Sequence, residues 1–135
     1  MRVVCDANVL ISALISSSGA PARIVDAWTS GAFELIVCPK LLGELRDVFT
    51  RSKLRNLVNP EAAAEYVNGL EEGALALPDP KVERSVAPDP DDDYLVALAS
   101  AGDADYLVSG DRHLTDLVDL KPPVLTPRQF VDRHL

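Results

Sequence analysis

Residues 1–15, MRVVCDANVLISALI, decide the predicted fold class of this 135-residue chain. The apolar run at 3–5 predicts a short buried strand, and Asp6 or Asn8 can cap a helix that follows it. Apolar side chains at helical spacing give that helix one buried face, formed by Leu10, Ile11, Leu14 and Ile15. A buried strand followed directly by an amphipathic helix is typical of an α/β fold.

The same alternation of strand and helix continues along the chain. Apolar runs predict further strands at 33–37, 74–77, 105–109 and 124–125. Helical periodicity predicts helices at 21–30, 39–52, 61–72 and 111–118, with Thr126 capping a terminal helix. The Pro- and Asp-rich stretch from Pro78 to Asp93 predicts a loop that leads into another helix. Repeated βα units predict a three-layer α/β/α sandwich around a central, mainly parallel sheet.

Length and composition fit one domain that spans residues 1–135. Apolar residues make up 47% of the chain, which is enough for a single sizeable core. No apolar run reaches the roughly 18 residues of a membrane span, and Asp6 interrupts the start too early for a signal peptide. We interpret the two cysteines, Cys5 and Cys38, as buried core thiols, which fits a reducing compartment. The sequence therefore predicts a cytoplasmic protein with no membrane contact.

The net charge of −8 is concentrated in the middle of the chain. Residues 60–111 contain 13 acidic and only 2 basic side chains. An acidic protein is not typical of nucleic-acid binding. The acidity either repels such a ligand or is neutralised locally, and a bound divalent metal would neutralise it.

Acidic residues follow several of the predicted strands and begin the adjoining helices. Asp6 ends the first strand, Asp111 follows the strand at 105–109, and Glu44 lies in the second turn of the helix at 39–52. Four more acids, Asp89, Asp91, Asp92 and Asp93, precede a helix. A parallel sheet brings strand ends and helix starts to one rim. Clustered carboxylates are ligands for Mg²⁺ or Mn²⁺, which activate water to attack phosphodiesters.

Four segments of the chain, taken in order, resemble the four motifs of the PIN domain family. These small nucleases include the VapC-type toxins of prokaryotic toxin–antitoxin pairs. The segments are VVCDANVL at 3–10, LLGEL at 41–45, DPDDDYLVALA at 89–99 and LVSGD at 107–111. Each motif alone is weakly specific, whereas four in order across nearly the whole chain are fairly specific.

The resemblance implies an endoribonuclease that depends on Mg²⁺ or Mn²⁺. It places the catalytic, metal-binding acids at Asp6, Glu44, Asp92 and Asp111, with Asp93 as an alternative to Asp92. It gives Asn8 and Ser109 supporting polar roles. It also implies RNA as the substrate, a small antitoxin protein as a partner, and a homodimer.

Each of these acids also has a purely structural interpretation. Asp6 and Asp111 can simply cap helices. Glu44 can pair with Lys40, four residues earlier on the same helix. The acids at 89–93 can be solvated residues that favour a helix N-terminus.

Five basic residues are concentrated on or just beyond the helix that carries Glu44. Lys40, Arg46, Arg51, Lys53 and Arg55 either hold an RNA backbone or form a solvated surface.

Two rival functions remain open at the level of sequence. One is a Mg²⁺-dependent phosphatase or phosphotransfer domain, although Asp6-Ala7-Asn8 lacks the second Asp that phosphatases of this architecture use. The other is a catalytically inactive PIN-like module that binds RNA or protein.

Overall fold

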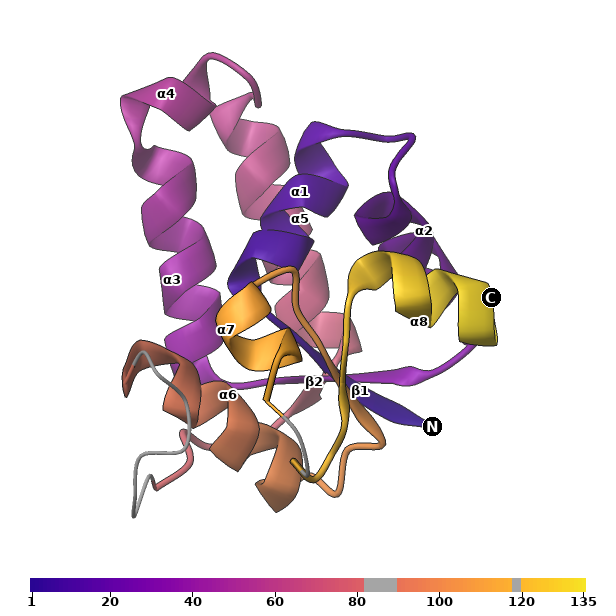
Figure 1. Ribbon diagram of the computed structural model, residues 1–135. Helices are drawn as coiled ribbons and strands as arrows, with labels where there is room; N and C mark the ends of the chain where they lie inside the picture. Colours follow the sequence, from indigo (N-terminus) through magenta and orange to yellow (C-terminus); the bar gives the residue numbers. More distant parts are fainter. Residues whose placement is uncertain (82–89, 118–119) are drawn as a thin grey trace.

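A computed structural model describes residues 1–81, 90–117 and 120–135, with only the backbone described for residues 90–93 (Figure 1). Five strands form one sheet in the order β3-β2-β1-β4-β5, and every neighbouring pair is parallel. The strands are β1 (Arg2–Cys5), β2 (Glu34–Val37), β3 (Leu75–Ala76), β4 (Tyr106–Val108) and β5 (Val124–Leu125). The predicted parallel sheet is confirmed, and β5 lies at one edge of it.

Helices connect and cover these strands. They are α1 (Ala7–Ile15), α2 (Ala20–Thr29), α3 (Pro39–Thr50), α4 (Ser52–Arg55), α5 (Pro60–Gly73), α6 (Pro90–Ala101), α7 (Arg112–Thr115) and α8 (Pro127–His134). Helix α6 contacts β1, β2 and β4, and Figure 1 shows it on the opposite side of the strands from α1, α2 and α5. The predicted three-layer α/β/α sandwich is therefore confirmed.

The central strands are buried on both faces, as strands in a covered parallel sheet must be. Val3, Val4 and Cys5 of β1 and Ile36 and Val37 of β2 are fully inaccessible to solvent. This double burial explains why the strands appear in the sequence as continuous apolar runs without polar alternation.

The two cysteines are free and buried, as predicted. Burial raises the pKa of the Cys5 thiol to about 12, and the Asp6 charge adds to the effect. Burial likewise raises the pKa of Cys38 to about 11. Both thiols therefore stay protonated at neutral pH and act as small core residues.

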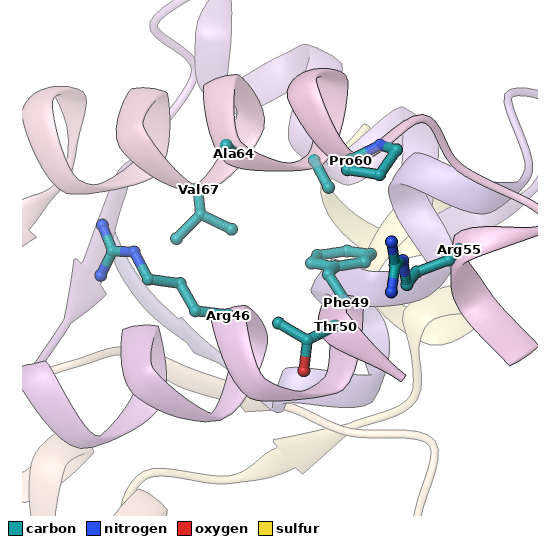
Figure 2. Close-up of a pocket in the computed structure, with 8 residues that line it drawn as sticks. Arg46, Phe49, Thr50, Arg55, Pro60, Ala64 and Val67 are labelled. Carbon is teal, nitrogen blue, oxygen red and sulfur yellow. The ribbon is translucent and has the colours of Figure 1, made fainter. Parts of the chain in front are cut away.

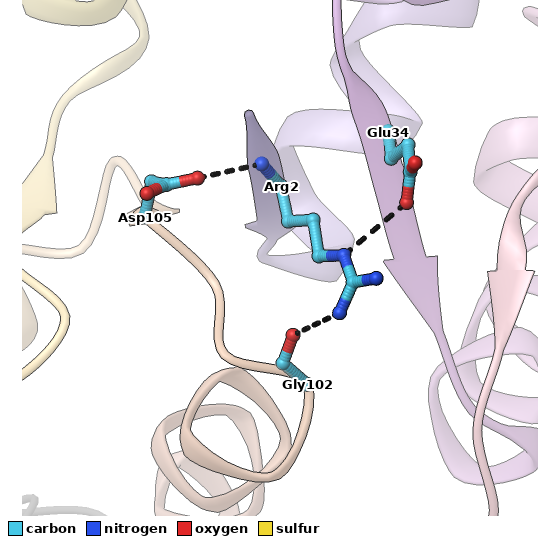
Figure 3. Close-up of polar contacts among 4 residues, drawn as sticks. All are labelled: Arg2, Glu34, Gly102 and Asp105. Carbon is cyan, nitrogen blue, oxygen red and sulfur yellow. Dashed lines mark hydrogen bonds and ion pairs between the residues drawn. The ribbon is translucent and has the colours of Figure 1, made fainter.

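Arg2 ties together the amino-terminal ends of three strands (Figure 3). Its backbone N–H donates to Asp105 Oδ2 at 2.8 Å, and its Nη1 donates to the Gly102 carbonyl at 3.1 Å. Its Nε lies 3.3 Å from Glu34 Oε2. The ion pair is exposed, so we expect it to contribute less than about 1 kcal/mol.

Helix α8 closes the fold by packing on α2 and β5. Thr126 caps it as predicted, in a reciprocal arrangement in which Gln129 bonds back to the Thr126 backbone. The Phe130 ring is fully buried and meets the rings of Phe33 and Tyr106 edge-on. This aromatic cluster attaches the end of the chain to the sheet.

Three predicted boundaries were wrong. The predicted loop that ends at Asp93 gives way to helix earlier, because Pro90 is well suited to a first turn and acids stabilise a helix N-terminus. The helix expected at 39–52 ends at Thr50, and the short α4 follows it. The helix expected at 111–118 ends at Thr115, within the described residues. Asp89 lies outside the described residues.

Within the described part of the chain, no single helix is long and apolar enough to cross a membrane. Helices α1 and α2 reach that length and apolar content only as a pair bent by 94°.

Candidate active site

Asp6 lies where β1 ends and α1 begins, at the point where the strand order reverses. The chain passes from β1 to β2 and β3 on one side, then returns to β4 and β5 on the other. Sheets of this kind bind ligands outside the carboxyl ends of the strands at such a reversal. Asp6 is only 7% exposed, and it caps α1 by accepting the Asn8 N–H at 3.3 Å. Capping therefore accounts for one carboxylate oxygen and leaves the other for a second role.

Ser109 links Asp6 to Asp111 across the ends of the neighbouring strands. The fully buried Ser109 hydroxyl donates to Asp6 Oδ2 at 2.8 Å and accepts the Asp111 N–H at 3.0 Å. Asp111 in turn caps α7, because its Oδ1 accepts the His113 N–H at 2.9 Å. A hydroxyl can donate and accept at once, so Ser109 orients the first carboxylate and the turn that carries the other.

Glu44 approaches the same region from α3. Its Oε2 accepts a hydrogen bond of 2.8 Å from the Tyr94 hydroxyl, which comes from α6. The Lys40 Nζ lies over the Tyr94 ring, 4.5 Å from its centroid. The Lys40 charge is therefore placed against the aromatic face, where a cation is attracted to the ring.

A cavity of about 330 Å³ brings part of this set together. Asp6, Asn8, Glu44 and Tyr94 line it, together with Asp47 and Arg51 of the α3 segment. Ser109 and Asp111 are not among its lining residues, although hydrogen bonds connect them to Asp6. Two of the four predicted acids, Asp6 and Glu44, thus line one cavity. A third, Asp111, is connected to Asp6 through Ser109.

The remaining predicted acids, Asp92 and Asp93, lie in the first turn of α6. Their side chains are outside the described part of the structure. Their backbone positions directly precede Tyr94, which lines the cavity. The choice between Asp92 and Asp93 as a ligand stays a prediction.

The donor set suits a hard divalent cation. Asp6 and Glu44 offer carboxylate oxygens, the ligands that Mg²⁺ and Mn²⁺ prefer. A buried carboxylate close to another is costly unless something positive lies nearby. Among the described residues, no group of three Asp, Glu, His or Cys side chains converges closely enough to hold a metal. A complete site therefore needs a further ligand, and the acids of α6 are suitably placed in sequence to supply one.

Of the five basic residues, Arg51 lies at the cavity. Its guanidinium pairs loosely with Asp47 at 3.3 Å, and both side chains are largely exposed. Arg46 and Arg55 instead line a separate groove between α3 and α5, at opposite ends of it in Figure 2. Arg46 of α3 also forms an ion pair of 2.6 Å with Glu71 of α5. Lys53 is exposed on α4.

Sequence reasoning missed Tyr94 and Asp47. Asp47 lies three residues after Glu44 on the same helix, so helical spacing could have placed both on one face. No local signal identifies Tyr94, because its role depends on how closely α6 approaches α3. Burial and the hydrogen bond to Glu44 raise the Tyr94 pKa far above its usual range, so its hydroxyl remains a neutral donor.

A family model and a relative each match most of this chain. A family model described as the PIN domain matches residues 2–113. An uncharacterized protein of Methanocaldococcus jannaschii is 27% identical over 143 residues, which span 98% of this chain and 90% of the relative.

Two solved structures share the fold at low sequence identity. PAE2754 of Pyrobaculum aerophilum matches with a TM-score of 0.68 and 17% identity, covering 98% of this chain and 94% of its own. VapBC2 of Rickettsia felis, solved bound to a DNA fragment from its promoter, matches with a TM-score of 0.64 and 12% identity. That match covers 93% of this chain and 98% of the other.

Proposed function

Because this chain belongs to the PIN domain family, we propose that it is a divalent-metal-dependent endoribonuclease that hydrolyses RNA phosphodiester bonds. The observation that carries the proposal is the buried Asp6 at the strand reversal, which shares a cavity with Glu44. A carboxylate at that place is costly for folding, and metal binding is a function that accounts for it.

In this proposal Asp6, Glu44, Asp111 and Asp92 or Asp93 hold Mg²⁺ or Mn²⁺. The bound metal would lower the pKa of a water molecule and stabilise charge on the phosphorane oxygens. Ser109 keeps the Asp6 carboxylate in one orientation through its hydrogen bond to Oδ2. The exposed Asn8 side chain makes no hydrogen bond to another described residue, and its amide lines the cavity, where it could contact the substrate.

Removing the metal is expected to abolish the activity. A mixed pool of structured and single-stranded RNA should be cut in the presence of Mn²⁺ or Mg²⁺ and left intact when EDTA is present. Undiminished cutting in EDTA would show that the reaction needs no divalent metal. If the wild-type protein neither cuts RNA nor binds metal in calorimetry, the catalytic proposal fails and an inactive binding module becomes the better interpretation.

Arg51 is the basic residue with the strongest claim to contact RNA. We expect Arg51→Ala to weaken RNA binding and to lower the slope of log affinity against log salt by about 0.7, the effect of one phosphate contact on a single strand. Lys40, Lys53, Arg46 and Arg55 remain weaker candidates, since Lys40 covers an aromatic ring and Arg46 is paired with Glu71.

Arg128→Ala is the matched control for Arg51→Ala. Arg128 has an acidic partner four residues away, as Arg51 does, and its side chain is 70% exposed compared with 67% for Arg51. Salt-dependent binding by fluorescence anisotropy compares the two variants. An equal effect of both substitutions would assign the loss to overall charge and remove Arg51 from the site.

We further propose that the protein is the toxin of a toxin–antitoxin pair and that it acts in the cytoplasm as a homodimer. Family membership and the fold shared with a VapBC protein support the pairing. The two free, buried thiols fit a reducing compartment. A small open reading frame next to the gene, with a product that blocks RNA cleavage, is the test of the pairing.

A further inference from the structure

We propose that Tyr94 is a positioning residue that fixes the Glu44 carboxylate for metal binding. The inference rests on the proposed metal-dependent function and adds a residue to its machinery. Tyr94 has no carboxylate group, so it does not itself offer the metal a carboxylate oxygen. Its effect would be exerted through Glu44.

The contact that supports this role is a partly buried hydrogen bond between two helices. The Tyr94 hydroxyl of α6 donates to Glu44 Oε2 of α3 at 2.8 Å. Tyr94 is only 4% exposed and lines the same cavity as Asp6 and Glu44. A hydrogen bond to a carboxylate is stronger than one between neutral groups, and its geometry is correspondingly well defined.

Lys40 lies over the face of the Tyr94 ring. Its Nζ lies 4.5 Å from the centre of the Tyr94 ring. The backbone N–H of Lys40 donates to Asp79 Oδ1 at 2.8 Å, which fixes the start of α3. Lys40 and Glu44 are four residues apart on α3, so the Tyr94 side chain contacts two successive turns of one helix. These contacts place the Tyr94 hydroxyl beside the Glu44 carboxylate.

We expect this hydrogen bond to restrict the rotation of the Glu44 side chain. Glu44 is half-buried on a helix, where a long side chain can otherwise exchange between rotamers. The bond to Tyr94 engages Oε2 and directs the carboxylate, while Oε1 lies outside this hydrogen bond. Residues that orient a metal-binding carboxylate contribute about 10- to 100-fold to metal affinity or activity.

The test compares two tyrosine-to-phenylalanine substitutions. Tyr94→Phe removes the hydroxyl that reaches Glu44, whereas Tyr66→Phe removes a hydroxyl that donates to the Leu10 carbonyl at 2.6 Å. Tyr66 does not line the cavity with Asp6 and Glu44. We expect Tyr94→Phe to weaken Mn²⁺ binding by about 10- to 100-fold in isothermal titration calorimetry, and Tyr66→Phe to leave it unchanged.

Cleavage kinetics and thermal unfolding add two further measurements. Tyr94→Phe should lower kcat at a fixed Mn²⁺ concentration and leave the KM for RNA unchanged. The substitution weakens metal binding but does not change the protein surface that binds RNA. If Tyr94→Phe does not fold, Lys40→Met replaces it, since that variant keeps the hydroxyl and removes only the charge above the ring. Lys40→Met should weaken Mn²⁺ binding by less than about tenfold.

The possible outcomes separate this inference from the function on which it rests. Equal Mn²⁺ affinity in wild type and Tyr94→Phe, or equal losses in Tyr94→Phe and Tyr66→Phe, overturns the positioning role. Mn²⁺ binding that depends on Tyr94 without any RNA cleavage supports the positioning role and rejects the ribonuclease. A wild-type protein that binds no Mn²⁺ overturns both.

Discussion

Replacing Asp6 with Asn is expected to reduce RNA cleavage by about 100- to 1,000-fold, the scale of losing one preorganised electrostatic group from an active site. The change removes one negative charge and keeps the shape of the side chain. The amide can still accept the Asn8 N–H, and its nitrogen can donate to the Ser109 hydroxyl oxygen that lies 2.8 Å from Asp6 Oδ2. Cleavage rates under Mn²⁺, measured with Mn²⁺ binding by calorimetry, check the prediction.

The fold should survive this substitution. Removing the Asp6 charge relieves repulsion from the other acids, so the metal-free variant should unfold at or above the temperature of the wild-type protein. Asp105→Asn is the matched control, because Asp105 also accepts a backbone N–H, from Arg2 at 2.8 Å, but at the opposite ends of the strands (Figure 3). Wild-type cleavage by Asp6→Asn would remove Asp6 from the site, and equal losses in both variants would indicate a general effect on folding.

Replacing Phe130 with Ala is expected to cost about 3–5 kcal/mol of unfolding free energy, the usual range for a buried phenylalanine. Its ring is fully buried, with ring centres 5.5 Å from Phe33 and 6.2 Å from Tyr106. Truncation leaves a cavity between α8 and the sheet. Urea unfolding followed by circular dichroism measures the loss, and the thermal midpoint should fall by more than about 10 °C.

Phe130→Leu is the control for this core substitution. It keeps most of the buried apolar volume and loses the two edge-on ring contacts, each worth about 0.5–1.5 kcal/mol. We therefore expect Phe130→Leu to be clearly more stable than Phe130→Ala. A loss below about 1.5 kcal/mol for Phe130→Ala, well under the range for a buried phenylalanine, would contradict the view that α8 is anchored through this ring.

The candidate site was only partly predictable from the sequence. The PIN-like motifs made Asp6, Glu44 and Asp111 candidates, because local patterns already define the strand or helix next to each. The structure places Asp6 and Glu44 in one cavity and connects Asp111 to Asp6 through Ser109, and their role in a site stays a prediction. The cavity then adds Asp47 and Tyr94, which no motif singled out. Of the five basic residues, the sequence could not distinguish Arg51, at the cavity, from Arg46, which pairs with Glu71 and lines the groove in Figure 2. The position of a residue along a helix does not show which other helix or strand its side chain contacts.

The sequence by itself determined the layered fold, because burial on both faces of a parallel sheet imposes apolar runs that alternate with amphipathic helices. It also determined which carboxylates end strands, as Asp6 does, since a charge cannot continue a strand buried on both faces. Only the tertiary structure decided that Tyr94 meets Glu44, 50 residues away, and that Ser109 meets Asp6, 103 residues away. Such contacts depend on how strands and helices pack. A local sequence pattern does not show which residues from distant parts of the chain come into contact.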